Sequence, residues 1–506
     1  MAELVNCILS LQTKYKNNKN VLEKLSFFVK KQLPALLEKY NEDEKKRDLL
    51  KDESKKYINE FIMNPDKQYF YIPATDLFIK YNGEIYEYLS EDEFWYIVLN
   101  DITNRNGEGP KLTEYKQRIK NTIVEHIKKR SIFKTIPESY TVQLVINFFT
   151  PMLFNTKEEV KHFLACIGDS ILNKKTDNIY FVPIKSKSFF DALESLCEYY
   201  FQSKLNITSS LRYRYRGQDF KKSRLIYFTR SIGNKSCWLS FLKENFLNFI
   251  IVCCHYSTRY IHADNYANKQ AINFKEKLFY LKNHTKENII NEFTDNIFEN
   301  CSGNNIKWED IYFLWKFYIK NKNIPNMIYK ADFENIIRNS LEHNGNVFTN
   351  IKSNHLNNVE YFKLFCNDNI TTDEDDLLEI SEMHKLVIKW LDDKEYSDFT
   401  EDYMKDMIEY FYNDITIEND KFLIGVKCKL WDKQGDMLEA LQKKFNKNIA
   451  DNVLIYDAYV MYCKYSNNNG KLLTVSKKYF YKYIDRIVPK QYIQDNSILF
   501  SYWSKN

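Results

Sequence analysis

Apolar residues recur at helical spacing along most of the chain and follow strand-like patterns only in short stretches. Residues 1–65 have the pattern of charged helices, because "YNEDEKKRDLLKDESKKYINEF" alternates acids and bases at spacings that suit i to i+4 pairs. Residues 236–410 are again mostly helical in pattern, interrupted by polar loops such as "CSGNN" and "TTDEDD". The pattern predicts a mixed α/β protein that is predominantly helical.

Two local signals predict a β-hairpin that runs directly into an amphipathic helix. Asn82-Gly83 lies between apolar and aromatic runs, and this pair favours the positive φ angles of a type I′ turn. Ser90 is followed three residues later by Glu93, which is the pattern of a capping box. The stretch "NRNGEGP" at 104–110 then predicts a linker.

The rest of the chain divides by pattern into a central body and a C-terminal unit. Residues 156–230 alternate between helical stretches and the strand-like "NIYFVPI", "LRYRYR" and "RLIYF", which predicts an α/β layer. The C-terminal stretch carries three helices, a strand-like "KLLTV" and a final "SILFSYW", an order compatible with a winged helix. The expected domains are an N-terminal helical region with a hairpin (1–105), a central α/β to helical body (111–410) and a winged-helix-like unit (430–506).

Composition narrows the functional classes only a little. The chain has 506 residues and a formal net charge of +5, too small for this length to imply nucleic acid by itself. Its 38 Tyr and 36 Phe accompany abundant Lys, Asn and Ile, all with A/T-rich codons, so the aromatic count alone is no argument for base stacking. The ten cysteines are scattered without a C-x-x-C pair, which indicates a reducing compartment without disulfides.

Membrane association is not expected from the sequence. The N-terminal apolar run is too short and too polar for a signal peptide, and we find no uninterrupted apolar stretch of about 18 residues. We therefore expect a cytoplasmic or nuclear protein with no membrane partner.

One segment invites comparison with the phosphate loop of a nucleotide hydrolase. The motif G-x-x-x-x-G-K-[ST] uses glycines so that backbone N–H groups can wrap the phosphates. In "TRSIGNKS" (229–236), the two glycine positions hold Thr229 and Asn234. We therefore expect a plain strand-to-helix junction with a serine cap rather than an ATP site.

Other catalytic or metal-binding patterns are also incomplete. The acids 373–376 could bind a divalent metal, but acids are also favoured at the start of a helix, here expected near "LLEI". Cys254, His255 and His262 lack a fourth zinc ligand nearby, and "FIIVCC" indicates a buried helix. We predict no catalytic residue, no metal site, no cofactor and, as the favoured reading, no enzymatic activity.

Two basic clusters remain as candidate nucleic-acid contacts. Strict alternation in "LRYRYR" would place three arginines on one strand face, with further cations following directly. This cluster comprises Arg212, Arg214, Arg216, Lys221, Lys222 and Arg224. Its cations could bind phosphates, or the strand could simply have a solvated polar face.

The second cluster lies on the predicted helix "VSKKYFYKYIDRI". Ser476 is the expected N-cap, and an apolar face would leave the cations outward. The inward residues are Phe480, Tyr483, Ile484 and Ile487, and the outward ones are Lys477, Lys478, Tyr481 and Lys482. Such a helix could enter a nucleic-acid groove, or it could be an ordinary solvated helix.

Two stretches resemble a known viral family. "LIYDAYVMYCKYSNNNGKLLTVSKKYFYKYI" resembles the C-terminal winged-helix region of the poxvirus-type primase-helicases of large DNA viruses. More faintly, "FLACIGDSILNKKTDNIYFVPIKSKSFFDAL" is similar to the opening of their ATPase core, with Pro183–Lys187 at the phosphate-loop position and no glycine there. The resemblance implies a viral protein built on a replication-helicase template that no longer hydrolyses ATP.

Two functional hypotheses follow from the sequence. The first is a non-enzymatic nucleic-acid-binding protein, with DNA favoured over RNA, that acts as an accessory factor or scaffold beside viral replication or virion proteins. It would reside in the host cytoplasm, the viral factory or the virion. The alternative is a virion structural or protein-interaction protein whose basic clusters are only solvated faces.

Overall fold

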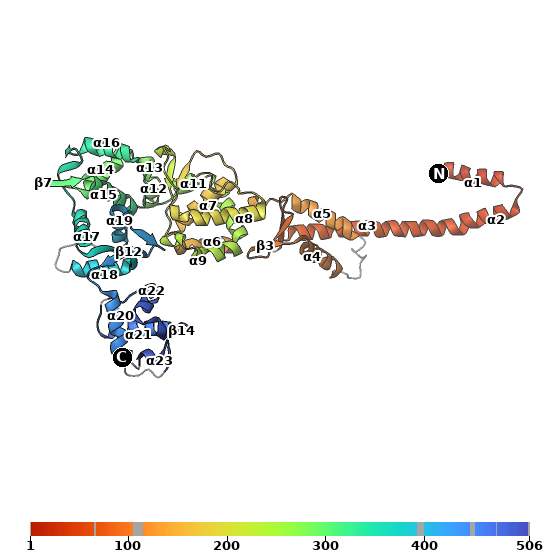
Figure 1. The fold of residues 1–506 in the computed structure, drawn as a ribbon. Helices are drawn as coiled ribbons and strands as arrows, with labels where there is room; N and C mark the ends of the chain where they lie inside the picture. Colours follow the sequence, from red (N-terminus) through yellow and green to blue (C-terminus); the bar gives the residue numbers. More distant parts are fainter. Residues whose placement is uncertain are drawn as a thin grey trace. The chain divides into compact units, whose positions relative to one another are not determined.

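The computed structural model divides the chain into two compact units, Met1–His284 and Thr285–Asn506 (Figure 1). Helices predominate, and every strand of the described residues belongs to a small three-stranded sheet, which confirms a mixed α/β, predominantly helical protein. The structure describes residues 2–64, 67–104, 115–391, 399–445, 451–471 and 473–503.

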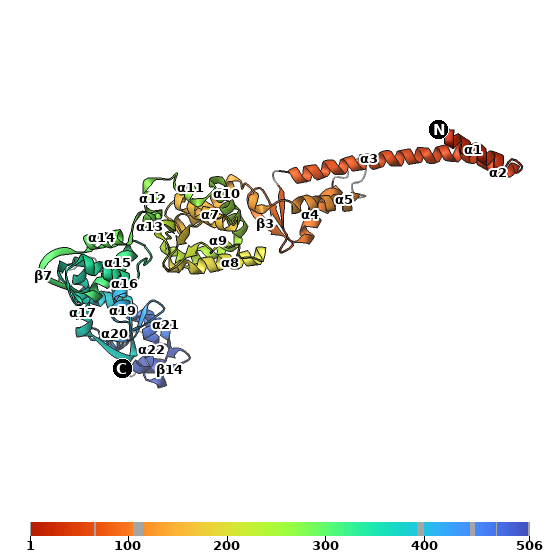
Figure 2. The same ribbon diagram turned by 90° about the horizontal axis from the view of Figure 1, so that it is seen from above.

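Long helices begin the first unit, as the charge pattern predicts. α1 (Ala2–Lys14) and α2 (Lys19–Phe27) contain no buried residue. A π-helical turn, Phe28–Gln32, leads into the 31-residue α3 (Leu33–Met63), which Figure 2 shows as a long rod. The buried residues of α3 begin at Leu50, so only its C-terminal half packs into a core.

A meander of three antiparallel strands follows and packs with two helices. The strands are β1 (Gln68–Ile72), β2 (Leu77–Tyr81) and β3 (Tyr86–Leu89). The helices are α4 (Glu91–Asn104) and α5 (Lys116–Lys128). The predicted linker lies outside the described residues from 105 onward.

The predicted hairpin is confirmed, but its turn is not type I′. The loop between β2 and β3 spans 82–85, and only Gly83 in it has a positive φ, of 100°. The Asn82 side chain accepts hydrogen bonds from the N–H groups of Glu84 and Ile85, both at 3.0 Å. Asn82 thus stabilises the turn through its side chain instead of adopting a left-handed backbone.

The capping box at the start of α4 is confirmed in both directions. The Ser90 hydroxyl accepts the N–H of Glu93 at 3.2 Å, and the Glu93 carboxylate accepts the N–H of Ser90 at 3.0 Å. This reciprocal pair satisfies two N–H groups that the helix end would otherwise leave unbonded.

The predicted α/β layer is a parallel sheet of very short strands. Its order is β5-β4-β6, with β4 (Ile179–Phe181) in the centre, β5 (Leu211–Arg212) on one side and β6 (Ser223–Leu225) on the other. The strand expected over "LRYRYR" is therefore wrong beyond Arg212. Its partner β4 soon reaches Pro183, which has no N–H to donate, and the ladder ends there.

The helices around this sheet form the largest apolar core of the unit. α7 (Lys157–Ile171) and α10 (Phe246–Tyr260) pack so closely that a Cβ on Gly168 would lie 2.1 Å from the carbonyl oxygen of Cys253. Glycine is therefore required where the two helix backbones meet. The remaining helices of this unit are α6 (Ser139–Met152), α8 (Lys187–Phe201), α9 (Lys235–Glu244), α11 (Ala263–Ala267), α12 (Ile272–Leu278) and α13 (Tyr280–Asn283).

The second unit contains two sheets that the sequence pattern did not predict. "CSGNN" belongs to β7 (Glu299–Lys307), and "TTDEDD" belongs to β10 (Ile370–Glu379). Both strands bulge out of register at these polar stretches. The acids 373–376 therefore lie in a strand bulge and not at a helix start, because the next helix, α18, begins only at Ile380.

The sheets of this unit have the orders β7-β9-β8 and β10-β12-β11. Their other strands are β8 (His343–Asn344), β9 (Val347–Lys352), β11 (Thr416–Glu418) and β12 (Phe422–Cys428). The accompanying helices are α14 (Lys286–Ile297), α15 (Trp308–Asn321), α16 (Lys330–Ser340), α17 (Asn354–Asn369), α18 (Ile380–Trp390) and α19 (Glu401–Phe411).

The C-terminal region has three helices and a small antiparallel sheet of order β13-β15-β14. In chain order these elements are α20 (Lys433–Phe445), β13 (Val453–Leu454), α21 (Ile455–Asn468), α22 (Lys477–Ile487), β14 (Ile493–Gln494), β15 (Ser497–Ile498) and a last turn, α23 (Phe500–Trp503). The described residues of "KLLTV" are not a strand, which corrects that prediction.

Candidate nucleic-acid interface

The first basic cluster does not form one face. β5 and β6 both run parallel to β4, so the end of β5 and the start of β6 lie at opposite edges of the sheet. Arg212 therefore lies at the carboxyl edge, whereas Lys221 and Lys222 lie just before β6 at the amino edge. The connection between them crosses the sheet and separates the predicted cations.

Arg224 is not available to a ligand. Its side chain is only 4% exposed, and its guanidinium is paired with the Asp264 carboxylate at 2.8 Å. A charge buried this deeply needs such a partner, so the Arg224–Asp264 ion pair is part of the protein core. The assignment of Arg224 to nucleic-acid binding is therefore wrong.

The other cations of this cluster differ in their partners. Lys222 pairs with Asp177 at 2.9 Å, and the Arg212 guanidinium donates to the carbonyls of Ser209 and Leu211. The remaining cluster members, Arg214, Arg216 and Lys221, have exposed side chains.

The carboxyl edge of the sheet gathers cations that sequence reasoning did not group. β4 is followed by 182–187 and β6 by 226–236, the two segments that match a phosphate loop imperfectly. They meet in space, because a Cβ on Gly233 would lie 3.8 Å from the Cβ of Lys185. Neither segment contains an acid. Their exposed cations are Lys185, Lys187, Arg230 and Lys235.

Part of the backbone of these two segments is hydrogen-bonded within local turns. Each forms a 3-10 turn, η4 (Ile184–Ser186) and η6 (Arg230–Gly233), in which the N–H of Ser186 bonds to the carbonyl of Pro183 and the N–H of Ile232 to that of Thr229. The N–H of Ser236 bonds to the side chain of Asn234, which is the N-cap of α9. The expected serine cap is therefore wrong, because the cap of this helix is Asn234.

The helix of the second cluster is present and largely oriented as predicted. Ser476 caps α22, and Lys477, Lys478 and Lys482 are exposed. Lys478 pairs with Glu418 at 2.5 Å, and Lys482 donates to the carbonyl of Asp375 at 2.7 Å. Its buried residues are Tyr479, Phe480, Tyr483 and Ile484, while Ile487 is half-buried.

The residues weighed for metal chemistry are part of the core. Cys254 is fully buried in α10, and burial raises the pKa of its thiol to about 12. Within the described ranges, no group of three or more His, Cys, Asp and Glu side chains is arranged to hold a metal ion.

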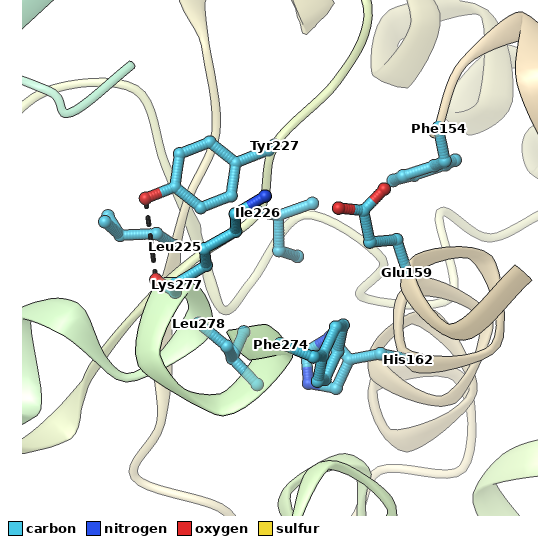
Figure 3. A pocket seen from close by; sticks show the side chains of 9 residues that line it. All are labelled: Phe154, Glu159, His162, Leu225, Ile226, Tyr227, Phe274, Lys277 and Leu278. Atoms are coloured by element: carbon cyan, nitrogen blue, oxygen red, sulfur yellow. Dashed lines mark hydrogen bonds between the residues drawn. The ribbon is translucent and has the colours of Figure 1, made fainter. Parts of the chain in front are cut away.

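A cavity near the sheet is too small for a nucleotide. It lies between α7, β6 and α12, and its volume of about 20 Å³ gives room for roughly one water molecule (Figure 3). His162 lines it, and burial lowers the pKa of this imidazole to about 4. The cavity residues are Phe154, Glu159, His162, Leu225, Ile226, Tyr227, Phe274, Lys277 and Leu278.

Comparisons with known proteins add no assignment. No protein-family model, no curated protein and no solved structure matches this chain. Among the described helices, none alone is long and apolar enough to span a membrane; α9 and α10, bent by 84° at their junction, pass that test only as a pair.

Proposed function

We propose that this chain is a non-enzymatic nucleic-acid-binding protein and that its main phosphate-binding surface is the carboxyl edge of the β5-β4-β6 sheet. The observation that carries the proposal is the meeting of 182–187 and 226–236, which bring Lys185, Lys187 and Lys235 to one edge without an acid in either segment. No ion pair joins these three lysines to another described residue. The carboxyl edge is also where ligands bind in open α/β sheets.

A phosphate polymer suits this edge better than a nucleotide does. Nucleotide sites wrap the phosphates in the backbone N–H groups of a glycine-rich loop, and here 182–187 has no glycine while Thr229 and Asn234 occupy the two glycine positions of 229–236. What remains is a set of exposed positive charges on lysine side chains. Such charges bind a phosphodiester backbone through counterion release and read little sequence.

The family resemblance suggests the biological role in which this binding would be used. The element order of 433–498, with three helices, a short strand and a hairpin, supports a winged-helix unit. We infer an inactive relative of the poxvirus-type primase-helicases, acting on DNA rather than RNA as an accessory factor or scaffold. Its place would be the host cytoplasm or viral factory.

The test is the salt dependence of binding to a labelled duplex, measured by fluorescence anisotropy with the full chain. The slope of log affinity against log salt should fall in magnitude by about 0.9 for each lysine that loses a phosphate contact. The triple variant Lys185→Ala, Lys187→Ala, Lys235→Ala should therefore reduce the slope by up to about 2.7. A slope that the triple variant leaves unchanged would exclude this edge.

A matched control is available on α3. Lys45, Lys46 and Lys51 are exposed side chains of this charged helix. Replacing these three by Ala removes the same net charge and should leave most of the slope intact. Equal losses in both variants would indicate a non-specific effect of net charge.

The protein-interaction alternative also has a structural observation in its favour. α1 and α2 carry no buried residue, yet they and the start of α3 expose large apolar side chains. Exposed apolar residues in this number favour contact with a partner. The most exposed are Leu4, Val5, Leu9, Phe27, Phe28, Leu36, Leu37 and Tyr40. A chain that ignores nucleic acid at about 50 mM salt would favour this alternative.

A further inference from the structure

α22 carries a straight cationic stripe. Lys478, Lys482 and Arg486 follow one another at i, i+4 and i+8, a spacing that places them on one side of a helix. Arg486 extends the pair of lysines that the sequence pattern identified. The stripe is about two turns long, comparable with the helix segment that other proteins place in a DNA groove.

Acids of the neighbouring sheet already occupy this stripe. Lys478 pairs with Glu418, at the end of β11. Arg486 pairs with the Asp375 carboxylate at 3.1 Å, and Lys482 donates to the carbonyl of the same residue. Asp375 reaches α22 because it lies in the bulge of β10, where 373–376 leave the pairing with β12.

We propose that the stripe on α22 is a second nucleic-acid-binding site and that Asp375 and Glu418 mask it by standing where phosphates would bind. This inference rests on the proposed nucleic-acid function, but it concerns a different surface and a different unit. In the free protein Glu418 pairs with Lys478 and Asp375 with Arg486, and a nucleic-acid backbone must displace these acids to bind the two cations.

The masking contacts are not what holds the C-terminal helices in place. Their side chains are 39–69% exposed, and exposed ion pairs contribute little to stability. Docking comes instead from buried contacts, which include the Lys433–Glu382 ion pair and the packing of Leu377 against this helical core. Masking acids can therefore exchange for phosphates without unfolding the unit.

Among the described residues, the other acids near the stripe form no ion pair with its three cations. Asp373 faces Lys427 at 3.7 Å, on the sheet itself. Asp376 is buried, and its carboxylate accepts the N–H of Leu377 at 2.7 Å. Asp485 is exposed on α22 beside the stripe and remains in every variant below.

The experiment removes the masking charges and leaves the stripe intact. In the full chain, Asp375→Asn with Glu418→Gln should bind a DNA duplex at least about five-fold more tightly near 100 mM salt. The salt slope should steepen by about 0.9 for each stripe cation that gains a phosphate. The control, Asp414→Asn with Glu360→Gln, makes the same charge change at two exposed acids of this unit, just before β11 and on α17, that form no ion pair with the described cations of α22.

Two further arms make the outcome decisive. Adding Lys478→Ala, Lys482→Ala and Arg486→Ala to the unmasked variant should abolish the gain. Repeating the unmasking in the Lys185→Ala, Lys187→Ala, Lys235→Ala background separates this inference from the proposed edge, because the gain should persist there. No gain over wild type, or an equal gain in the control pair, would overturn the masking, whatever the edge variants do.

Discussion

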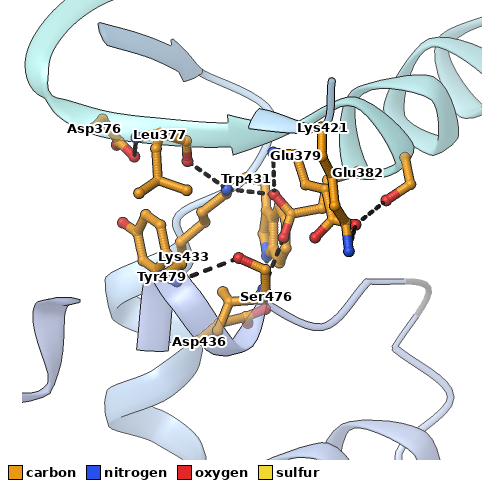
Figure 4. A network of polar contacts seen from close by, with 12 residues as sticks. Asp376, Leu377, Glu379, Glu382, Lys421, Trp431, Lys433, Asp436, Ser476 and Tyr479 are labelled. Carbon is orange, nitrogen blue, oxygen red and sulfur yellow. Dashed lines mark hydrogen bonds and ion pairs between the residues drawn. The ribbon is translucent and has the colours of Figure 1, made fainter. Parts of the chain in front are cut away.

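Lys433 and Glu382 form an ion pair of 2.6 Å in which the two side chains are only 6% and 5% exposed (Figure 4). The same Glu382 carboxylate accepts the N–H of Ser476 at 2.9 Å and that of Glu379 at 3.0 Å. Glu379, Lys433 and Ser476 stand at the starts of α18, α20 and α22. One carboxylate therefore joins three helix N-termini, where negative charge is favoured.

Breaking this pair should strongly destabilise the second unit. Glu382→Gln leaves the Lys433 ammonium buried without its counter-charge, at an expected cost of about 3–5 kcal/mol in the free energy of unfolding. Urea unfolding followed by circular dichroism measures the change. Glu125→Gln, at an exposed pair with Lys129, is the control and should leave the midpoint unchanged. A Glu382→Gln protein as stable as wild type would show that the site admits water.

Local signals explain which parts of this fold could be predicted from the sequence. Ser90 and Glu93 bond across three residues, and the helices of the C-terminal region carry clear 3.6-residue periodicity, so both were predicted. β7 and β10 were missed, because their polar stretches are held by pairing with β9 and β12 far along the chain. Polar bulges have no alternation to detect.

The candidate site was harder to predict than the fold, for the same reason. Lys185 and Gly233 are neighbours only because β4 pairs in parallel with β6, a contact that neither local segment specifies. Arg224 was misassigned because its partner Asp264 lies in a separate helix. The sequence held only a weak signal for this edge. Two segments, 182–187 and 226–236, contain cations and no acid, and each directly follows a strand-like run.

Gly168→Ala should destabilise the first unit, because the new Cβ would meet the carbonyl of Cys253 at 2.1 Å. Backbone atoms cannot move aside cheaply, so an overpacking cost of about 1–3 kcal/mol or more is expected. Gly233→Ala is the matched control, since its Cβ would lie 3.8 Å from the nearest atom and its φ is not positive. Thermal unfolding of both variants measures the difference; equal midpoints would contradict the tight helix crossing.

Asn234→Ala should remove the N-cap of α9 and cost about 1 kcal/mol, because the N–H of Ser236 loses its acceptor. Ser236→Ala keeps that acceptor and should stay within about 0.5 kcal/mol of wild type. Denaturant midpoints of the two variants distinguish the caps. A larger loss of stability in Ser236→Ala than in Asn234→Ala would instead support the serine cap that the sequence suggested.

Acid should destabilise the first unit through His162. Its folded pKa of about 4 lies below the ordinary value of about 6.5, so the unfolded chain binds the proton more readily. Stability from this residue is present above about pH 6.5 and is lost as pH falls towards 4, by about 2 kcal/mol at pH 5. His162→Leu should therefore lose about 2 kcal/mol less than wild type between pH 7 and 5 in urea titrations. Parallel losses in both proteins would mean that the imidazole is hydrated in the folded state.

Nucleotide should not stabilise the protein, and Lys235 provides the sharpest test. A phosphate-loop lysine faces several negative charges, and its loss removes contacts worth about 1.5–3 kcal/mol. Here Lys235 is exposed at the start of α9, and the N–H groups of its neighbours Asn234 and Ser236 are already bonded, to the Ser231 carbonyl and the Asn234 side chain.

A nucleotide at 100 times its dissociation constant would add about 2.7 kcal/mol to folding, a shift that thermal denaturation detects readily. We expect no shift with millimolar ATP and magnesium, no ATPase activity with or without DNA, and no effect of Lys235→Ala on either measurement. The same substitution should still weaken DNA binding, because a phosphate polymer needs only the charge. A nucleotide-induced shift that Lys235→Ala removes would instead assign this edge to a nucleotide hydrolase and refute the non-enzymatic proposal.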